Sequence, residues 1–141
     1  MRFNIRAFLL SSVATVMMIG SAAMAEPVLG LWQTQSGEDG GYAHVDVKPC
    51  DGKVCGTIIK TFEDDGSVST TPEAKDVLGT VIIKDMVSHG DGTYSGGTIY
   101  APDTEKTYNS KMAVTSDNVL QVKGCVLGGL ICRGQEWTRV Q

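Results

Sequence analysis

Apolar and polar residues alternate in short segments along the chain after residue 25, and these segments are rich in Val, Ile, Thr and Tyr. In residues 42–48, for example, Val45 and Val47 alternate with polar neighbours. This two-residue period is typical of β-strands with one buried face, and no helical period is sustained over residues 26–141. Seven clusters of turn-forming residues separate eight such segments, at 36–41, 50–55, 63–76, 88–93, 101–106, 115–118 and 126–131.

Eight strands with short connections predict an antiparallel meander. A meander of this size closes naturally into an up-and-down barrel, which leaves no free strand edge. A two-sheet sandwich is the alternative, but its crossovers usually need longer connections. The pattern therefore predicts an all-β fold, an eight-stranded antiparallel up-and-down β-barrel, with residues 26–141 forming one domain. Its one long connection is at 63–76.

The first 25 residues follow a different pattern. Arg2 and Arg6 precede an apolar run at 7–19, which is short for a membrane span, and Ala23-Met24-Ala25 offers the small residues of a cleavage site. This is the pattern of a secretory signal peptide. We expect cleavage between Ala25 and Glu26, and a mature protein in the periplasm or outside the cell with no membrane span.

The signal peptide contains two of the 12 basic residues and none of the 16 acidic ones. The mature chain therefore keeps 10 basic residues and has a net charge of −6. An acidic surface argues against binding to nucleic acid or to anionic lipid headgroups. We expect no nucleic-acid partner.

The four cysteines are Cys50, Cys55, Cys125 and Cys132. In an oxidising compartment an even number of cysteines indicates disulfides first. A four-cysteine zinc site is the alternative, and it usually has roughly two to four residues within each pair. Here the first pair encloses four residues and the second encloses six, so we expect disulfides and no metal.

Several motifs occur in an order that resembles known families. The Gly-x-Trp of Gly30-Leu31-Trp32 on the first strand, with Arg139 on the last, is similar to the pair that lipocalins and other calycins share. Nearly the whole mature chain resembles a bacterial family of small secreted proteins known as domain of unknown function 2147. The motifs that carry this resemblance are Gly30-Leu31-Trp32, Cys50 to Gly56, Gly96-Gly97-Thr98-Ile99-Tyr100-Ala101-Pro102, Lys106-Thr107-Tyr108 and Gly124 to Arg139. The resemblance implies a lipocalin-like barrel whose arginine lies over the tryptophan, but it implies no activity.

Strand parity supports that closure independently. In an eight-stranded meander the first strand starts and the last strand ends at the same end of the barrel, so Trp32 and Arg139 can meet. A guanidinium over an indole face gains about 0.5–2 kcal/mol and shields the base of the core from water. We therefore expect these two residues to form a latch at one end, and we refer to the other end as the mouth.

The same parity predicts which cysteines pair. Cys50 and Cys55 flank the second connection, at the latched end, whereas Cys125 and Cys132 flank the seventh, at the mouth. The two ends lie a strand length of about 20 Å apart, and a disulfide needs Cα atoms within about 7 Å. We therefore predict the disulfides Cys50–Cys55 and Cys125–Cys132.

The sequence offers little for catalysis. It has no Gly-x-Ser-x-Gly elbow, no His-Glu-x-x-His motif and no phosphate-binding loop. His44 and Asp46 share the polar face of their strand and could form an acid–base pair, but an exposed pair on a convex wall lacks a pocket. His89 falls in a turn. We expect no enzymatic activity and no cofactor.

Ligand binding is the stronger hypothesis, because an eight-stranded barrel is either filled by side chains or holds one small ligand. Strand alternation places five residues inside the barrel, toward its mouth: Phe62, Tyr100, Tyr108, Met112 and Val122. An apolar cup with tyrosine hydroxyls suits a small apolar or amphipathic ligand. We expect residues 63–76 to cover it as a lid. The same five residues could instead simply fill the core.

A protein-binding or inhibitor module is the alternative function. Residues 126–131 form a Gly-rich loop with four apolar side chains, braced by the predicted Cys125–Cys132 disulfide. Apolar residues exposed on a rigid loop suit contact with a protein partner. A filled barrel with this loop exposed would favour a partner, whereas a cavity above about 300 Å³ would favour a small ligand.

Overall fold

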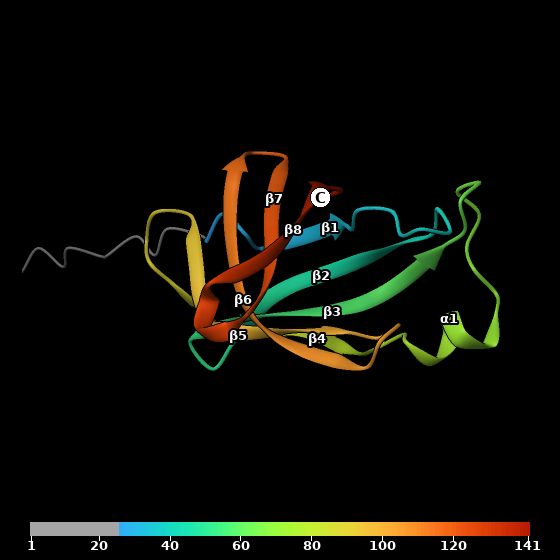
Figure 1. Ribbon diagram of the computed structural model, residues 1–141. Helices are drawn as coiled ribbons and strands as arrows, with labels where there is room; N and C mark the ends of the chain where they lie inside the picture. The colour runs from blue at the N-terminus through green and yellow to red at the C-terminus, as the bar shows by residue number, and fades with distance from the viewer. Residues whose placement is uncertain (1–25) are drawn as a thin grey trace, which may run out of the picture.

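The computed structural model describes residues 26–141, and its strands form a closed antiparallel β-barrel (Figure 1). Strands that are neighbours in the sequence are hydrogen-bonded neighbours in the barrel. The barrel closes where β1 pairs with β8, through Trp32 opposite Arg139 and Gln33 opposite Thr138. The elements are β1 Gly30–Gln33, β2 Tyr42–Cys50, β3 Lys53–Phe62, α1 Pro72–Asp76, β4 Val81–Ser88, β5 Thr93–Ala101, β6 Lys106–Ser116, β7 Val119–Val126, the 3₁₀ turn η1 Leu127–Gly129 and β8 Ile131–Arg139.

Each predicted turn cluster coincides with one of the connections between these strands. The eight-stranded up-and-down barrel predicted from the alternation is therefore confirmed. The predicted signal peptide, residues 1–25, lies outside the described residues. Within residues 26–141 no helix has the length and apolar character to cross a bilayer.

The core is anchored by two tryptophans, near the point where β1 meets the end of β8. Trp32 and Trp137 are 0% and 1% exposed, and Trp137 lies opposite Leu120 of β7. Each large apolar side chain buried in this way contributes about 1.5–3 kcal/mol. The other apolar members of the core are Val28, Val45, Val47, Val54, Ile58, Ile82, Ile83, Met86, Tyr94, Met112 and Val122.

β-Bulges interrupt the pairing in the wall and reverse the alternation beyond them. The β2–β3 ladder slips between His44 and Val45, and the β5–β6 ladder slips between Tyr94 and Gly97. At such a slip two residues oppose one, so the side chains that follow change face. Glycine is required at Gly97 for a separate reason, because a Cβ there would overlap the backbone of β4.

The long connection between β3 and β4 folds beside the end of β3. Phe62 and Val68 form an isolated bridge, and the Thr71 hydroxyl caps α1 by accepting a hydrogen bond from the Ala74 N–H. None of the α1 residues is buried, and the helix stands beyond the end of β3 in Figure 1. The lid role expected for residues 63–76 stays a prediction.

Candidate functional site

Arg139 closes one end of the barrel over Trp32. Its guanidinium carbon lies 4.2 Å from the centroid of the indole ring, which is the geometry of a cation–π contact. The same guanidinium donates hydrogen bonds to the carbonyl oxygens of Pro27, Leu29 and Asp117, at 2.6, 3.0 and 2.6 Å. One charged group therefore ties the N-terminal segment and the β6–β7 turn to β8.

The glycine of the Gly-x-Trp motif has a steric role in the same contact. Gly30 has a φ of +131°, and a Cβ there would overlap the carbonyl oxygen of Gln141. That oxygen accepts a hydrogen bond from the Leu31 N–H at 2.8 Å. Trp32 is held from the other side, since its Nε1–H donates to the Val28 carbonyl at 2.8 Å. The motif therefore lets the end of the chain run directly alongside β1.

Glu26 joins this closed end, although sequence reasoning gave it no role beyond the start of the mature chain. Its carboxylate accepts hydrogen bonds from the Tyr94 hydroxyl at 2.8 Å and from the Ser88 hydroxyl at 3.0 Å. Burial, followed by the hydrogen bond and charge of Glu26, raises the pKa of Tyr94 far above its ordinary value. Tyr94 is therefore a permanent hydrogen-bond donor at the base of the core.

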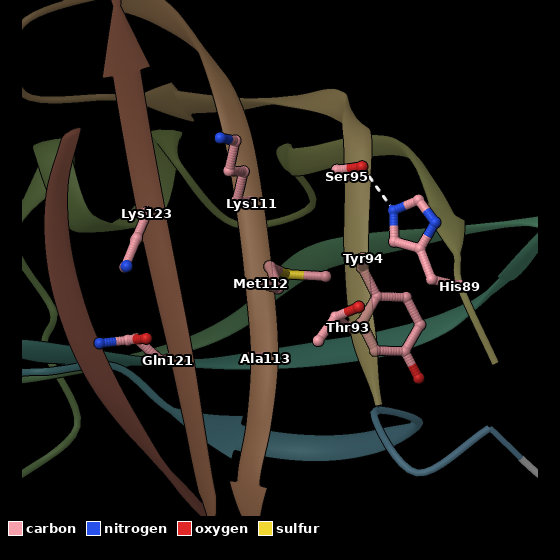
Figure 2. A pocket seen from close by; sticks show the side chains of 9 residues that line it. All are labelled: His89, Thr93, Tyr94, Ser95, Lys111, Met112, Ala113, Gln121 and Lys123. Carbon is pink, nitrogen blue, oxygen red and sulfur yellow. Dashed lines mark hydrogen bonds between the residues drawn. The ribbon is translucent and has the colours of Figure 1, made fainter. Parts of the chain in front are cut away.

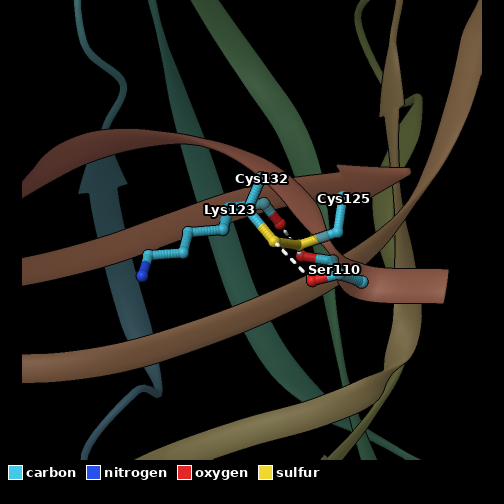
Figure 3. Close-up of a disulfide and its surroundings, with 5 residues drawn as sticks. Ser110, Lys123, Cys125 and Cys132 are labelled. Carbon is cyan, nitrogen blue, oxygen red and sulfur yellow. Dashed lines mark hydrogen bonds between the residues drawn. A yellow bond between two sulfur atoms is a disulfide. The ribbon is translucent and has the colours of Figure 1, made fainter. Parts of the chain in front are cut away.

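Both disulfides have the predicted pairing. Cys50–Cys55 spans the β2–β3 turn with Cα atoms 5.9 Å apart, and Cys125–Cys132 spans the β7–β8 turn with Cα atoms 4.1 Å apart. Figure 3 shows the second disulfide beside Ser110, which donates a hydrogen bond to a β7 carbonyl at 2.9 Å. Two disulfides indicate an oxidising compartment.

Three of the five residues expected at the mouth face the barrel interior. Met112 and Val122 are cross-strand partners on β6 and β7, and they are 3% and 2% exposed. Tyr108 lies farther along β6, opposite Ile99 of β5, and is half-buried. Gly124 leaves room for its ring, because a Cβ at that glycine would lie 3.3 Å from the Tyr108 Cβ.

Phe62 does not join this group, because it lies on the outer face of the barrel. It follows the slip in the β2–β3 ladder and pairs with Tyr42. Its ring stacks on Tyr42 with centroids 4.8 Å apart and lies 4.5 Å from the ring of His44. Since Val45 points into the core, Tyr42 and His44 occupy the outward positions of β2.

Tyr100 is half-buried and packs against the core, but it lies on the opposite face of β5 from Ile99. Tyr94 points into the core, and unbroken alternation from it would bring Tyr100 inside. The slip between Tyr94 and Gly97 gives the interior position to Ile99, which pairs with the buried Ile83. Tyr100 pairs with Thr107 and therefore does not share the interior row of Ile99 and Tyr108.

His44 and Asp46 share the outer face of β2 but have different partners. Asp46 forms an ion pair with Lys48 at 2.9 Å, whereas His44 packs against Phe62. Partial burial, with a smaller effect of the charge of Lys60, lowers the pKa of His44. The lowered pKa favours the neutral imidazole, and the ring lies against Phe62 rather than in an acid–base pair with Asp46.

β8 is exposed on both of its faces over most of its length. Trp137 is 1% exposed, but Ile131 to Glu136 are all exposed, although β8 pairs with β7 along its length. These residues are exposed because β1 pairs with β8 only through two residue pairs, which lie at the C-terminal end of β8. Farther along, a side chain spans the gap, where Gln35 Oε1 accepts a hydrogen bond from the Glu136 N–H at 3.2 Å.

The β7–β8 connection folds over the outer wall. Gly129 approaches Lys111 of β6, whose Nζ would lie 3.7 Å from a Cβ on that glycine. The loop therefore does not plug the mouth. Leu127 and Leu130 project from it with 68% and 86% of their surfaces exposed.

Two adjoining hollows lie on the outer wall of β5, β6 and β7. The larger has a volume of about 300 Å³ and is lined by residues of all three strands and by His89 (Figure 2). The smaller, of about 210 Å³, shares Ser95 and Lys111 with it and extends to η1. Sequence reasoning missed this surface, because it depends on the slip in the β5–β6 ladder. Two features of the sequence could have pointed to this surface: the pair Gly96-Gly97 and the two lysines on neighbouring strands.

The fold and these surfaces define a small, disulfide-bonded, eight-stranded barrel of the lipocalin type. The chain belongs to the bacterial family described as "Uncharacterized protein conserved in bacteria (DUF2147)", whose model matches residues 30–139. Among solved structures, protein HP1028 from Helicobacter pylori, described as belonging to the lipocalin family, matches with a TM-score of 0.63 and 22% identity, over 80% of this chain and 82% of that chain. This likeness shows a shared fold. No curated protein matches the chain.

Proposed function

We propose that this protein is a non-enzymatic binding protein of the periplasm or the extracellular space, and that it takes a small apolar or amphipathic ligand into the mouth half of the barrel. The observation that carries the proposal is the contrast along the interior row of β8. Trp137 is almost fully buried, whereas Gln135 and Arg133 of the same row are exposed. The base of the interior is thus filled, and the exposed residues of β8 border the mouth end at which we place the ligand.

The mouth residues suit a ligand of mixed character. Tyr108 and Ile99 offer apolar surface above the buried Met112 and Val122. The Tyr108 hydroxyl and the polar row of β8 can hold a polar end group. The lipocalin-type fold supports the same role, because an eight-stranded barrel is wide enough to hold one small ligand where side chains do not fill it.

The compartment is part of the proposal and has separate support. The two disulfides require oxidising conditions to form and persist. The pattern of residues 1–25 is that of a signal peptide cleaved before Glu26.

A fluorescent hydrophobic probe tests the mouth. Tyr108→Ala should weaken probe binding about tenfold, because it removes an interior ring worth on the order of 1–2 kcal/mol of apolar contact. Phe62→Ala is the matched aromatic control, since it removes a ring from the outer wall, and it should leave binding unchanged. If the wild-type barrel binds no probe, or if both variants lose binding equally, the mouth is not a ligand site.

Contact with a protein partner through the β7–β8 loop is the second candidate function. The observation that favours it is the exposure of Leu127 and Leu130 on a loop held by a disulfide. Native mass spectrometry of the protein isolated from its own periplasm is the test. A co-purifying protein should be lost in the Leu127→Ser, Leu130→Ser double variant and retained in Leu78→Ser, which changes an exposed leucine elsewhere. Retention in the double variant would exclude this loop.

A further inference from the structure

We propose that the outer wall of β5, β6 and β7 carries a second binding site, for a small organic oxyanion, between Lys111 and Lys123. These lysines are direct cross-strand partners on β6 and β7, so they share one face. Like charges directly opposite each other destabilise a sheet. Neither lysine makes an ion pair among residues 26–141, although that part of the chain has a net charge of −6. An oxyanion placed between them would relieve the repulsion.

The two side chains start together and then diverge. Lys111 extends toward η1, as its proximity to Gly129 shows, and Lys123 lies along Gly134 of β8, where a Cβ would be 3.5 Å from the Lys123 Cγ. Figure 2 shows both lysines on the wall of the larger hollow. Each ammonium sits on a flexible four-carbon stem with three donors. Both can therefore turn toward one anion without a change in the backbone.

The strand opposite Lys111 is shaped to add further donors. Ser95 and Gly96 occupy the slip in the β5–β6 ladder, so two residues face one. Such a bulge leaves one residue without a partner in the β5–β6 ladder, although Ser95 still pairs with Val87 of β4. Gly96 has a φ of +82°, and backbone N–H groups next to such a residue can form an anion-binding concavity. The Ser95 hydroxyl and His89 Nε2 lie 2.5 Å apart and share a hydrogen bond, which holds the hydroxyl in place.

The size and lining of the hollow define the class of ligand. Its volume of about 300 Å³ lies at the lower end of the range for small-molecule pockets, roughly 300–1,000 Å³. Ala113 adds apolar surface next to the lysines. The site therefore fits a carboxylate or a phosphate on a short apolar body, with the charge between the lysines and the body against Ala113.

Three probes with six carbon atoms each test this assignment. Hexanoate and hexyl phosphate carry an oxyanion, whereas hexanol carries no charge. Nuclear magnetic resonance titrations of the mature protein should show both anions shifting the amide signals of Ser95, Gly96 and Lys111. Both should bind at least tenfold more tightly than hexanol, and their affinity should fall as salt is raised, because the site is exposed to screening.

Charge-removing variants test the lysines themselves. Lys111→Met and Lys123→Met keep the aliphatic stem, and each should weaken hexanoate binding about tenfold. Lys53→Met, at the start of β3, makes the same change in net charge and should leave binding unchanged. Because the two lysines repel each other, both site variants should keep or raise the thermal midpoint, so loss of binding will not reflect unfolding.

Several outcomes would overturn the proposal. Equal affinity for hexanol and hexanoate, or undiminished anion binding in the Lys111→Met, Lys123→Met double variant, would exclude the oxyanion site. Inorganic phosphate binding as tightly as hexyl phosphate would exclude the apolar part of the ligand. Tyr108→Ala separates this site from the mouth, since hexanoate should still shift Ser95 and Gly96 in that variant.

Discussion

The guanidinium of Arg139 stacks 4.2 Å from the ring of Trp32, and the same two residues are backbone partners that join β8 to β1. Side-chain stacking and strand pairing therefore close the barrel at one place. The β1–β8 seam has two residue pairs, whereas the β7–β8 ladder has eight. A short seam has few other contacts to hold it, so closure depends strongly on this stack.

Trp32→Ala and Arg139→Ala should each destabilise the barrel, by about 3–5 kcal/mol for the tryptophan and about 2–4 kcal/mol for the arginine. The double variant should lose less than the sum, by about 1–3 kcal/mol, because the two side chains share one contact. Urea unfolding of the four proteins measures this coupling. Strict additivity would mean that the stack contributes nothing to stability.

Gly97→Ala should destabilise the barrel by about 1–3 kcal/mol through overpacking. A Cβ at this position would overlap the Lys84 carbonyl oxygen on β4, and backbone cannot move aside as a side chain can. Gly134→Ala is the control, because a Cβ there would have its closest contact at 3.5 Å, with a lysine side chain. Thermal unfolding should separate the two variants clearly. Equal midpoints would show that β4 and β5 do not approach as closely as described.

Removing the Cys125–Cys132 disulfide by substitution of both residues with Ala should cost about 2–2.5 kcal/mol. The change should also speed hydrogen exchange in the β7–β8 loop, which folds over the bridge. Removing Cys50–Cys55 should cost a similar amount but leave exchange in that loop unaltered. If both variants show the same exchange at residues 127–131, the bridge does not hold the loop against the wall. Peptide mapping without reduction checks the pairing directly.

His44 should make the barrel less stable in mildly acidic solution. Burial and the charge of Lys60 lower its pKa in the folded state, so the unfolded chain takes up the proton first as pH falls below about 6.5. The contribution of His44 to the free energy of unfolding is therefore full above about pH 6.5. It is lost as the pH falls from there toward the lower pKa of the folded state. Urea unfolding at pH 7.5 and 5.5 should show a smaller loss for His44→Gln than for wild type. An equal loss in both proteins would assign the effect to other groups.

The fold could be predicted from the sequence because its determinants are local. The two-residue period, the turn clusters and the positions of Trp32 and Arg139 can be recognised without knowing any contact. A meander then pairs each strand with its neighbour in the sequence. The disulfide pairing followed from the same parity, because cysteines at opposite ends of a barrel cannot meet. In each case the order of residues along the chain was enough to predict which of them lie close together.

The face on which each aromatic residue lies was decided by the tertiary structure. Alternation predicted Phe62 and Tyr100 in the interior row with Tyr108, but two slips in the strand pairing placed them on the other face of their strands, where Tyr100 still packs against the core. A slip of one residue moves every later side chain to the opposite face, and its position depends on packing between strands that lie apart in the sequence. Gly97 illustrates this, because it is fixed by the approach of Lys84 from β4. The accessible mouth along β8 and the lysine-lined outer hollow arise from the same long-range contacts. The sequence by itself therefore determined the barrel, its closure and its bridges, while the packing of the wall decided which surfaces are left for a ligand.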